Sequence, residues 1–506
     1  MSIVIGNKDL TCNDVLKVAR FKEKVELAEE AEKRILKSRE LVEEYVKEGK
    51  IAYGVTTGVG KLCNTYVSPK QAEELQVNLS RSHACGVGEP LLEEEARAIM
   101  LIRLNTFSLG YSGVTIELVE MLINMLNNGV TPFLPRKAGN GSGGSLSICA
   151  NLALCVRGEG RAFYQGQEME SKKALEMAGL KPIVLKAKEC LCLINGTHTA
   201  CGIAALAYCD LLNAVKAAEI TAAINLEAIS GNTAAFDERI NNAKRHKGQR
   251  DAAKNINLML TDSAIYNMKH KSVQDAYSFR CLPQIHGGVR EMLDGVKYEL
   301  ENEINSASDN PQTLVDDKLI FSCGNFNGQL LSMFTDNLAL ACSVLAKITE
   351  RRIARMVDPQ CTGLPDFLIE NSGVNSGYMI PQYVAANMEA EIKLLANPVS
   401  SDSTPVSGGQ EDVNSNVTIS ANKARDAVDD MNTMLGVELI VAAQALELSK
   451  REDLGKGTIA AVKKIRSIVP SLESDRWLEP EIVACAKLVQ SGEYVAAVEE
   501  AVGKLY

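Results

Sequence analysis

The stretch best suited to chemistry is the glycine-dense turn at residues 138–146, Ala-Gly-Asn-Gly-Ser-Gly-Gly-Ser-Leu, which runs directly into an apolar segment. Four of the six residues from 139 to 144 are glycine, so the backbone can adopt positive φ angles that residues with a Cβ avoid. The turn is not a phosphate-binding loop of a known kind, because it has neither a Walker pattern nor a GxGxxG motif that follows a strand. A flexible connection is the simplest alternative.

The residues on either side of this turn form a frame. Pro135 lies eight residues before Gly143, and a Gly-Glu-Gly motif at 158–160 follows the apolar run 146–154. This frame resembles the histidine and phenylalanine ammonia-lyase family, whose pattern reads Gly-Ala-Ser-Gly-Asp-Leu. In that family the Ala-Ser-Gly triad cyclises and dehydrates to a methylidene-imidazolone (MIO), an electrophile made from the chain itself. Aligned without gaps, the resemblance places the triad on residues 142–144.

The aligned triad is Ser142-Gly143-Gly144, and Ser145 takes the place of the aspartate. Ring closure needs only attack of the Gly144 nitrogen on the Ser142 carbonyl, but the methylidene carbon must come from the Cβ of the central residue. Gly143 has no Cβ, so we expect no MIO and no other cofactor. A shifted register, Gly141-Ser142-Gly143, would supply a serine and a self-formed MIO. It requires an insertion on one side of the turn and a deletion on the other.

Composition indicates an ordinary globular protein. The 506 residues are 46% hydrophobic and 23% charged, enough for a large core in two or more domains. A net charge of −10 argues against nucleic acid or an anionic membrane as the main partner. The first residues do not resemble a signal peptide, and no run approaches about 18 uninterrupted apolar residues. We therefore expect a cytoplasmic protein whose partners are small molecules and other protein chains.

Cysteine and histidine usage gives no sign of a metal site. Most of the 14 cysteines, such as Cys149 and Cys201, lie among apolar and small residues, where a thiol behaves as a small hydrophobe. No C-x-x-C pair occurs, the pair Cys190 and Cys192 is weak evidence for a metal, and only five histidines are present. We expect no bound metal.

Tyr53 lies in a glycine-rich loop, residues 52–60, which follows an exposed amphipathic helix predicted over residues 22–50. The family carries Tyr-Gly-x-Asn-Thr-Gly-Phe-Gly here, and its tyrosine removes the β-proton of the substrate. The resemblance therefore implies that Tyr53 is catalytic, although Thr56 and Val59 depart from the pattern. Without the resemblance the loop would be a linker. A phenol with a pKa of about 10 also needs a nearby cation or helix terminus to act as a base at neutral pH.

Two further segments resemble family motifs that contact the substrate. His83, in the segment 75–86, resembles the residue that faces the substrate side chain in histidine-specific members. Asn195, in Leu-Ile-Asn-Gly-Thr at 193–197, resembles an asparagine that hydrogen-bonds the prosthetic group and the substrate amine. Taken alone, the histidine would be structural and the asparagine would belong to a turn.

Residues 273–284 give the most specific match to the family. An arginine offers a planar fork that binds a carboxylate through two hydrogen bonds, and the resemblance makes Arg280 the clamp for the substrate carboxylate. The same match implies that Gln274 lines the site and that Tyr277 is a second catalytic tyrosine. By itself, an arginine is more often part of a surface ion pair.

The last matching motifs lie at 324–328 and 401–412. The resemblance assigns Phe326, Gln410 and Glu411 to substrate binding, with the glutamate near the side chain of the substrate in histidine-specific enzymes. Asn327 stands where family members commonly have a histidine. On its own, the Gln-Glu-Asp sequence at 410–412 would be a solvated turn or a helix start.

Long apolar patterns with three- and four-residue spacing predict helices at about 329–356, 378–396 and 416–450. The resemblance implies a mainly α, ammonia-lyase/fumarase-like bundle of long helices with a smaller mixed N-terminal domain. A change in composition near residue 205 suggests domains at 1–205 and 206–506. In the family the bundle assembles as a homotetramer with active sites shared between subunits.

Three functions remain open, so the sequence does not decide whether the chain is an enzyme. It could be a histidine ammonia-lyase homologue without MIO, which binds a histidine-like amino acid and has absent or very weak lyase activity. It could be an active carbon-nitrogen lyase, converting L-histidine to urocanate and ammonia with MIO in the shifted register. Thirdly, it could be a non-catalytic partner of an active paralogue.

Overall fold

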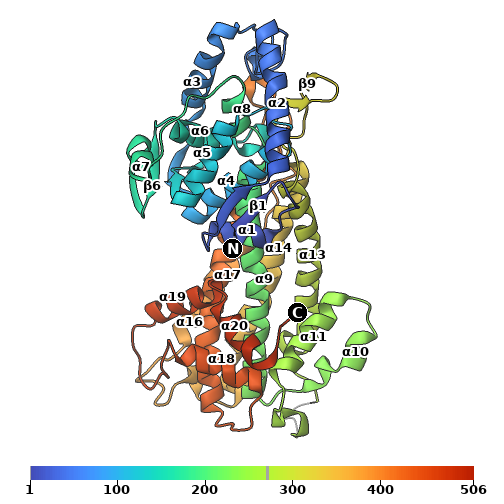
Figure 1. Ribbon diagram of the computed structural model, residues 1–506. Helices are drawn as coiled ribbons and strands as arrows, with labels where there is room; N and C mark the ends of the chain where they lie inside the picture. Colours follow the sequence, from blue (N-terminus) through green and yellow to red (C-terminus); the bar gives the residue numbers. More distant parts are fainter. Residues whose placement is uncertain (1, 269–272) are drawn as a thin grey trace. The chain divides into compact units, whose positions relative to one another are not determined.

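The computed structural model describes residues 2–268 and 273–506 (Figure 1). The chain forms two compact units, each built from separated segments. The first unit comprises Met1–Cys209, Lys297–Asp336 and Pro398–Asn422. The second comprises Asp210–Val296, Asn337–Asn397 and Lys423–Tyr506. The sequence suggested a single division near residue 205, whereas the first unit also takes in two later segments of the chain.

Four long helices carry the chain from one unit to the other, and this is why the units are discontinuous in sequence. These helices are α9 (His198–Ala228), α13 (Leu282–Ile304), α14 (Gln329–Met356) and α17 (Val417–Leu448). A composition change along the chain cannot reveal such returns, because they depend on which distant segments pack together.

The first unit is mixed. Its helices are α1 (Cys12–Ala19), α2 (Glu29–Glu48), α3 (Ala72–His83), α4 (Glu93–Ser108), α5 (Ile116–Asn128), α6 (Leu146–Val156), α7 (Ser171–Met177) and α8 (Glu189–Ile194), with short 3-10 turns η1 (Gly60–Leu62), η2 (Pro69–Gln71), η3 (Ser142–Gly144) and η7 (Ser407–Gly409). Its strands are β1 (Ser2–Ile5), β2 (Lys24–Leu27), β3 (Val87–Pro90), β4 (Val130–Pro132), β5 (Pro135–Lys137), β6 (Arg161–Tyr164), β7 (Gln167–Glu170), β8 (Gln312–Leu314) and β9 (Leu319–Phe321).

These strands form small separate sheets. The strands β1 and β2 pair in parallel, and β3 pairs antiparallel with β5. A third sheet is antiparallel and contains β4, β6 and β7 in that order, and β8 and β9 form a hairpin. The helix predicted over 22–50 therefore begins later than expected, because residues 24–27 pair with β1 and bury Val25. It ends at Gly49, whose φ of 64° closes α2 with a left-handed cap.

The second unit is helical throughout its described residues. It contains α10 (Glu238–Asn242), α11 (Lys247–Met259), α12 (Tyr277–Arg280), α15 (Pro359–Thr362), α16 (Met379–Leu395), α18 (Lys456–Arg466), α19 (Glu479–Gln490) and α20 (Glu493–Val502), with the turns η4 (Thr233–Phe236), η5 (Ala264–Asn267) and η6 (Asp366–Leu368). The predicted long helices correspond to α14, α16 and α17, and the mainly α class is confirmed.

Three helical stretches, at 189–228, 329–356 and 417–448, are long and apolar enough by composition to cross a membrane. Their most apolar windows are nevertheless 100%, 61% and 83% buried inside the protein. Packing against the protein's own core therefore accounts for most of this apolar character.

Candidate functional site

A cavity of about 470 Å³ in the first unit gathers loops that are far apart in the sequence. One wall is the loop after α2, another is the glycine turn, and others come from the end of α8, the loop before α14 and the turn η7. The predicted site residues that line it are Tyr53, Ser142, Asn195, Phe326, Gln410 and Glu411. Six sequence-predicted side chains thus meet in one place.

The glycine turn bends into the single 3-10 turn η3 just before α6. Three successive residues have positive φ: Ser142 at 46°, Gly143 at 77° and Gly144 at 77°. The turn is closed by the Gly144 N–H, which donates to the Gly141 carbonyl at 2.8 Å. A backbone of this kind is easy for glycine and strained for residues with a Cβ.

Gly143 is also enclosed on the side where a Cβ would point. A Cβ at this position would lie 2.5 Å from the carbonyl oxygens of both Gly196 and Phe326. Both atoms belong to the backbone, so neither can move aside cheaply. The Gly196 carbonyl is held further by the buried Ser145 hydroxyl, which donates to it at 2.6 Å. The space around the central turn residue therefore matches glycine.

Tyr53 is turned into the cavity, and its hydroxyl accepts a hydrogen bond from the Gly60 N–H at 2.9 Å. Burial raises the pKa of Tyr53 more than the hydrogen bond from Gly60 lowers it, and the nearby Glu411 carboxylate adds a smaller increase. The phenol is therefore protonated at neutral pH. The charge that acts on it has the opposite sign from the one a tyrosine base requires.

Polar atoms in the cavity are available to a ligand. The Ser142 hydroxyl donates to Glu411 Oε2 at 3.2 Å. The Asn195 carbonyl accepts from Arg103 Nη2 at 2.7 Å, which fixes the backbone, while its buried side-chain oxygen has no hydrogen-bond partner among the described residues. Buried acceptors are normally satisfied, so this oxygen points to a donor such as an ammonium group.

Comparison with known proteins shows the family to which this chain belongs. The family model for "Aromatic amino acid lyase" matches residues 10–467. The histidine ammonia-lyase of Alkaliphilus oremlandii is 44% identical over 502 residues, which span 99% of each chain. The chain belongs to the aromatic amino acid lyase family. The aligned residues cover 99% of the chain, so both units are included in the comparison.

Solved structures of other members share the lyase fold. Tyrosine aminomutase from Streptomyces globisporus superimposes with a TM-score of 0.95 and 33% identity, covering 100% of each chain. A structure described as the ergothioneine degrading enzyme ergothionase from Treponema denticola, in complex with desmethyl-ergothioneine sulfonic acid, has a TM-score of 0.92 and 29% identity, covering 98% of this chain and 100% of that chain.

The remaining predicted residues of this family member lie outside the Tyr53 cavity. His83 is half-buried at the end of α3, its Nδ1 lies 3.0 Å from the Ser82 hydroxyl, and burial lowers its pKa. Gln274, Tyr277 and Arg280 belong to the second unit. They contact one another there, because Arg280 Nη1 donates to Gln274 Oε1 at 2.5 Å and the guanidinium lies 4.8 Å from the Tyr277 ring centroid.

Sequence reasoning missed several residues of the cavity wall. Asn310, Cys63 and Cys323 line it, and the Cys323 N–H donates to Asn310 Oδ1 at 2.6 Å. Asn310 is polar, but by residue type alone a pocket asparagine cannot be told from a turn asparagine. The cysteines carry no signal either, because a thiol in a pocket and a thiol in the core look alike in sequence.

Proposed function

We propose that this member of the aromatic amino acid lyase family keeps a pocket for a histidine-like amino acid but lacks the MIO electrophile. Ammonia elimination from L-histidine is then absent or very weak. The support for a histidine-like ligand is the high identity to proteins named histidine ammonia-lyase, together with a cavity that holds a carboxylate and an unpaired amide oxygen.

The observation that carries this proposal is Gly143. It supplies no Cβ for a methylidene, and its surroundings leave no room for one in the present backbone. The residues at 142–144 therefore do not fit the prosthetic group in the ungapped register. Without an electrophile, binding groups hold the substrate but do not activate its poor amine leaving group.

In this proposal Glu411 and Asn195 bind the cationic and polar parts of the ligand, and Tyr53 donates a hydrogen bond as a neutral phenol. Arg280 is the proposed clamp for the carboxylate, with Gln274 and Tyr277 beside it. We also propose a cytoplasmic homotetramer, in which a ligand could be held by residues of more than one subunit.

The deciding experiment is the intact mass of the purified protein, with peptide mapping of residues 138–146, combined with an absorbance assay for urocanate and calorimetric titration with L-histidine. We expect an unmodified mass, saturable histidine binding and little or no urocanate. A mass deficit of two waters on the peptide with Ser142, together with rapid urocanate formation, overturns the proposal and establishes an active lyase in the shifted register. An unmodified protein that does not bind histidine instead indicates a non-catalytic partner subunit.

A second reaction is favoured by the solved relative described as ergothioneine degrading. Ergothioneine carries its α-nitrogen as a trimethylammonium group, which departs as neutral trimethylamine without capture by an electrophile. An elimination of this type needs a pocket for the cation and a base that takes the β-proton. Because Tyr53 is protonated, the proposed base is the Glu411 carboxylate of the same cavity. The test is to offer the unmodified protein histidine and its N-trimethyl betaine side by side. Trimethylamine released from the betaine, with no ammonia from histidine, is the expected pattern for this reaction.

A further inference from the structure

The second unit contains a cavity of about 330 Å³ that shares no lining residue with the Tyr53 cavity. Its walls come from η4, α10, α11 and the residue Tyr506. Phe236 and Tyr506 contribute aromatic rings, and Arg250 and Lys254 contribute cations. The combination of flat apolar surface and positive charge in one cavity sets the chemistry that it can bind.

The two cations face the same side of α11 because they are four residues apart. Within residues 2–268 and 273–506, neither has a carboxylate within ion-pair distance. The Lys254 ammonium lies 4.8 Å from the centroid of the Tyr506 ring. One acidic side chain, Glu238, also lines the cavity, and its carboxylate accepts from Asn242 Nδ2 at 3.4 Å. Two cationic side chains and one acidic side chain therefore line this cavity.

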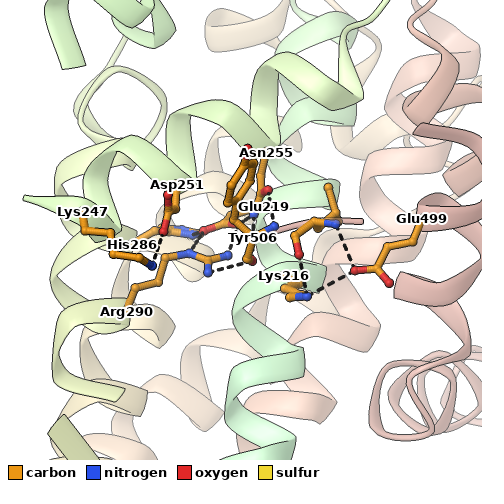
Figure 2. A network of polar contacts seen from close by, with 10 residues as sticks. Lys216, Glu219, Lys247, Asp251, Asn255, His286, Arg290, Glu499 and Tyr506 are labelled. Carbon is orange, nitrogen blue, oxygen red and sulfur yellow. Dashed lines mark hydrogen bonds and ion pairs between the residues drawn. The ribbon is translucent and has the colours of Figure 1, made fainter. Parts of the chain in front are cut away.

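The backbone of Tyr506 is held in place by polar contacts (Figure 2). The Tyr506 N–H donates to Asn255 Oδ1 at 2.9 Å, and its backbone oxygen accepts from Arg290 Nη1 at 2.9 Å. Arg290 is itself fixed by two hydrogen bonds to the fully buried Glu219, at 2.8 and 2.5 Å.

The backbone of Phe236, in η4, is also fixed by a hydrogen bond. Phe236 is 2% exposed, and its carbonyl accepts from Asn257 Nδ2 at 2.8 Å. A wall that is ordered before the ligand arrives reduces the entropy lost on binding. The cavity is therefore a pre-formed space, with its cations on one helix and its rings on two other segments.

We propose that this cavity is a second ligand site, which binds a small aromatic carboxylate. The guanidinium and ammonium groups of Arg250 and Lys254 take the carboxylate, since an arginine fork matches its two oxygens. The ring of Tyr506, which is 51% exposed, takes the flat part of the ligand. A dicarboxylate or phosphate is disfavoured by Glu238, and a cationic amino acid is repelled by the two cations.

The test is binding of β-naphthoate to the full chain, measured by calorimetry and by saturation-transfer NMR, with β-naphthamide as the uncharged analogue. We expect one saturable naphthoate site per chain and about tenfold or more weaker binding of the amide, as the loss of a charge-assisted contact predicts. Equal affinity for the two probes, or no naphthoate binding, overturns the proposal.

Variants locate the site. Arg250→Gln and Lys254→Gln are each expected to weaken naphthoate binding by roughly tenfold, with only a small change in the thermal unfolding midpoint, because both side chains are half-buried and outside ion pairs. Lys244→Gln is the matched control, since Lys244 is exposed between α10 and α11 and does not line the cavity. Naphthoate affinity that is unchanged in both test variants, or lowered equally by the control, assigns the binding elsewhere and overturns the proposal.

Discussion

Replacing Gly143 by serine tests how closely the turn is built around glycine. The substitution restores the residue type of the family triad, but it must adopt a φ of 77° and bring a Cβ to 2.5 Å from two backbone oxygens. The left-handed backbone costs about 1–2 kcal/mol for a residue with a Cβ, and overpacking typically costs about 1–3 kcal/mol. We therefore expect Gly143→Ser to lower the free energy of unfolding by roughly 2–5 kcal/mol.

Gly166→Ser is a matched control for the backbone cost. Gly166 lies in the hairpin between β6 and β7 of the same unit, has a φ of 76°, and has open space where a Cβ would point. It should lose only about 1–2 kcal/mol. The excess destabilisation of Gly143→Ser over Gly166→Ser then measures the clash with the carbonyls of Gly196 and Phe326.

The assay is thermal and urea unfolding of both variants, with peptide mass and urocanate formation recorded on the same samples. At roughly 2–4 °C per kcal/mol for a domain of about 150–250 residues, the two midpoints should differ by several degrees. We expect little lyase activity in Gly143→Ser, because Ser145 still replaces the family aspartate and holds the Gly196 carbonyl. Equal midpoints for the two variants, or strong urocanate formation by Gly143→Ser, would refute the reasoning.

Three further outcomes follow from the contacts described above. Ser145→Ala leaves the Gly196 carbonyl without its buried donor and should cost about 1–3 kcal/mol in urea unfolding; a loss within error would show that the carbonyl finds another donor. The Tyr53 phenol should ionise above the ordinary tyrosine pKa, because burial and a neighbouring carboxylate raise its pKa. Its contribution to stability is then complete below the ordinary tyrosine pKa and is lost as pH rises through the pKa of the folded state. An ultraviolet difference titration against Tyr53→Phe measures this, and phenolate that forms at or below the ordinary tyrosine pKa would contradict it. Burial raises the pKa of Glu219, but Arg290 and His286 together outweigh burial and lower the pKa to about 2. The stability that ionised Glu219 contributes is present above the ordinary glutamate pKa and is lost as pH falls toward about 2. Arg290→Met leaves the buried Glu219 carboxylate without its arginine and should lower the free energy of unfolding by about 3–5 kcal/mol. An acid-unfolding curve for this variant that matches the unsubstituted protein would contradict the prediction.

The sequence by itself determined the long helices, because their apolar residues recur with the helical period and this signal is local. The helices α14, α16 and α17 lie within two residues of their predicted bounds. It also determined that Gly143 has no Cβ, a fact of covalent structure that no fold can alter. Ordered motifs over most of the chain were enough to indicate the family, which the comparisons confirm.

Tertiary structure decided what depends on distant segments. The sequence of residues 24–27 is compatible with a helix, but these residues pair with β1 and therefore form a strand. The phenol of Tyr53 was expected to need a cation, whereas the fold brings the Glu411 carboxylate to it.

The fold also set the surroundings of the central glycine. The carbonyls of Gly196 and Phe326 close around Gly143, although they lie 53 and 183 positions further along the chain. Contacts of this kind follow from how long helices return the chain to one place, and no local periodicity records them. The residue type at 143 was therefore readable from sequence, while the reason that only glycine fits there came from the structure.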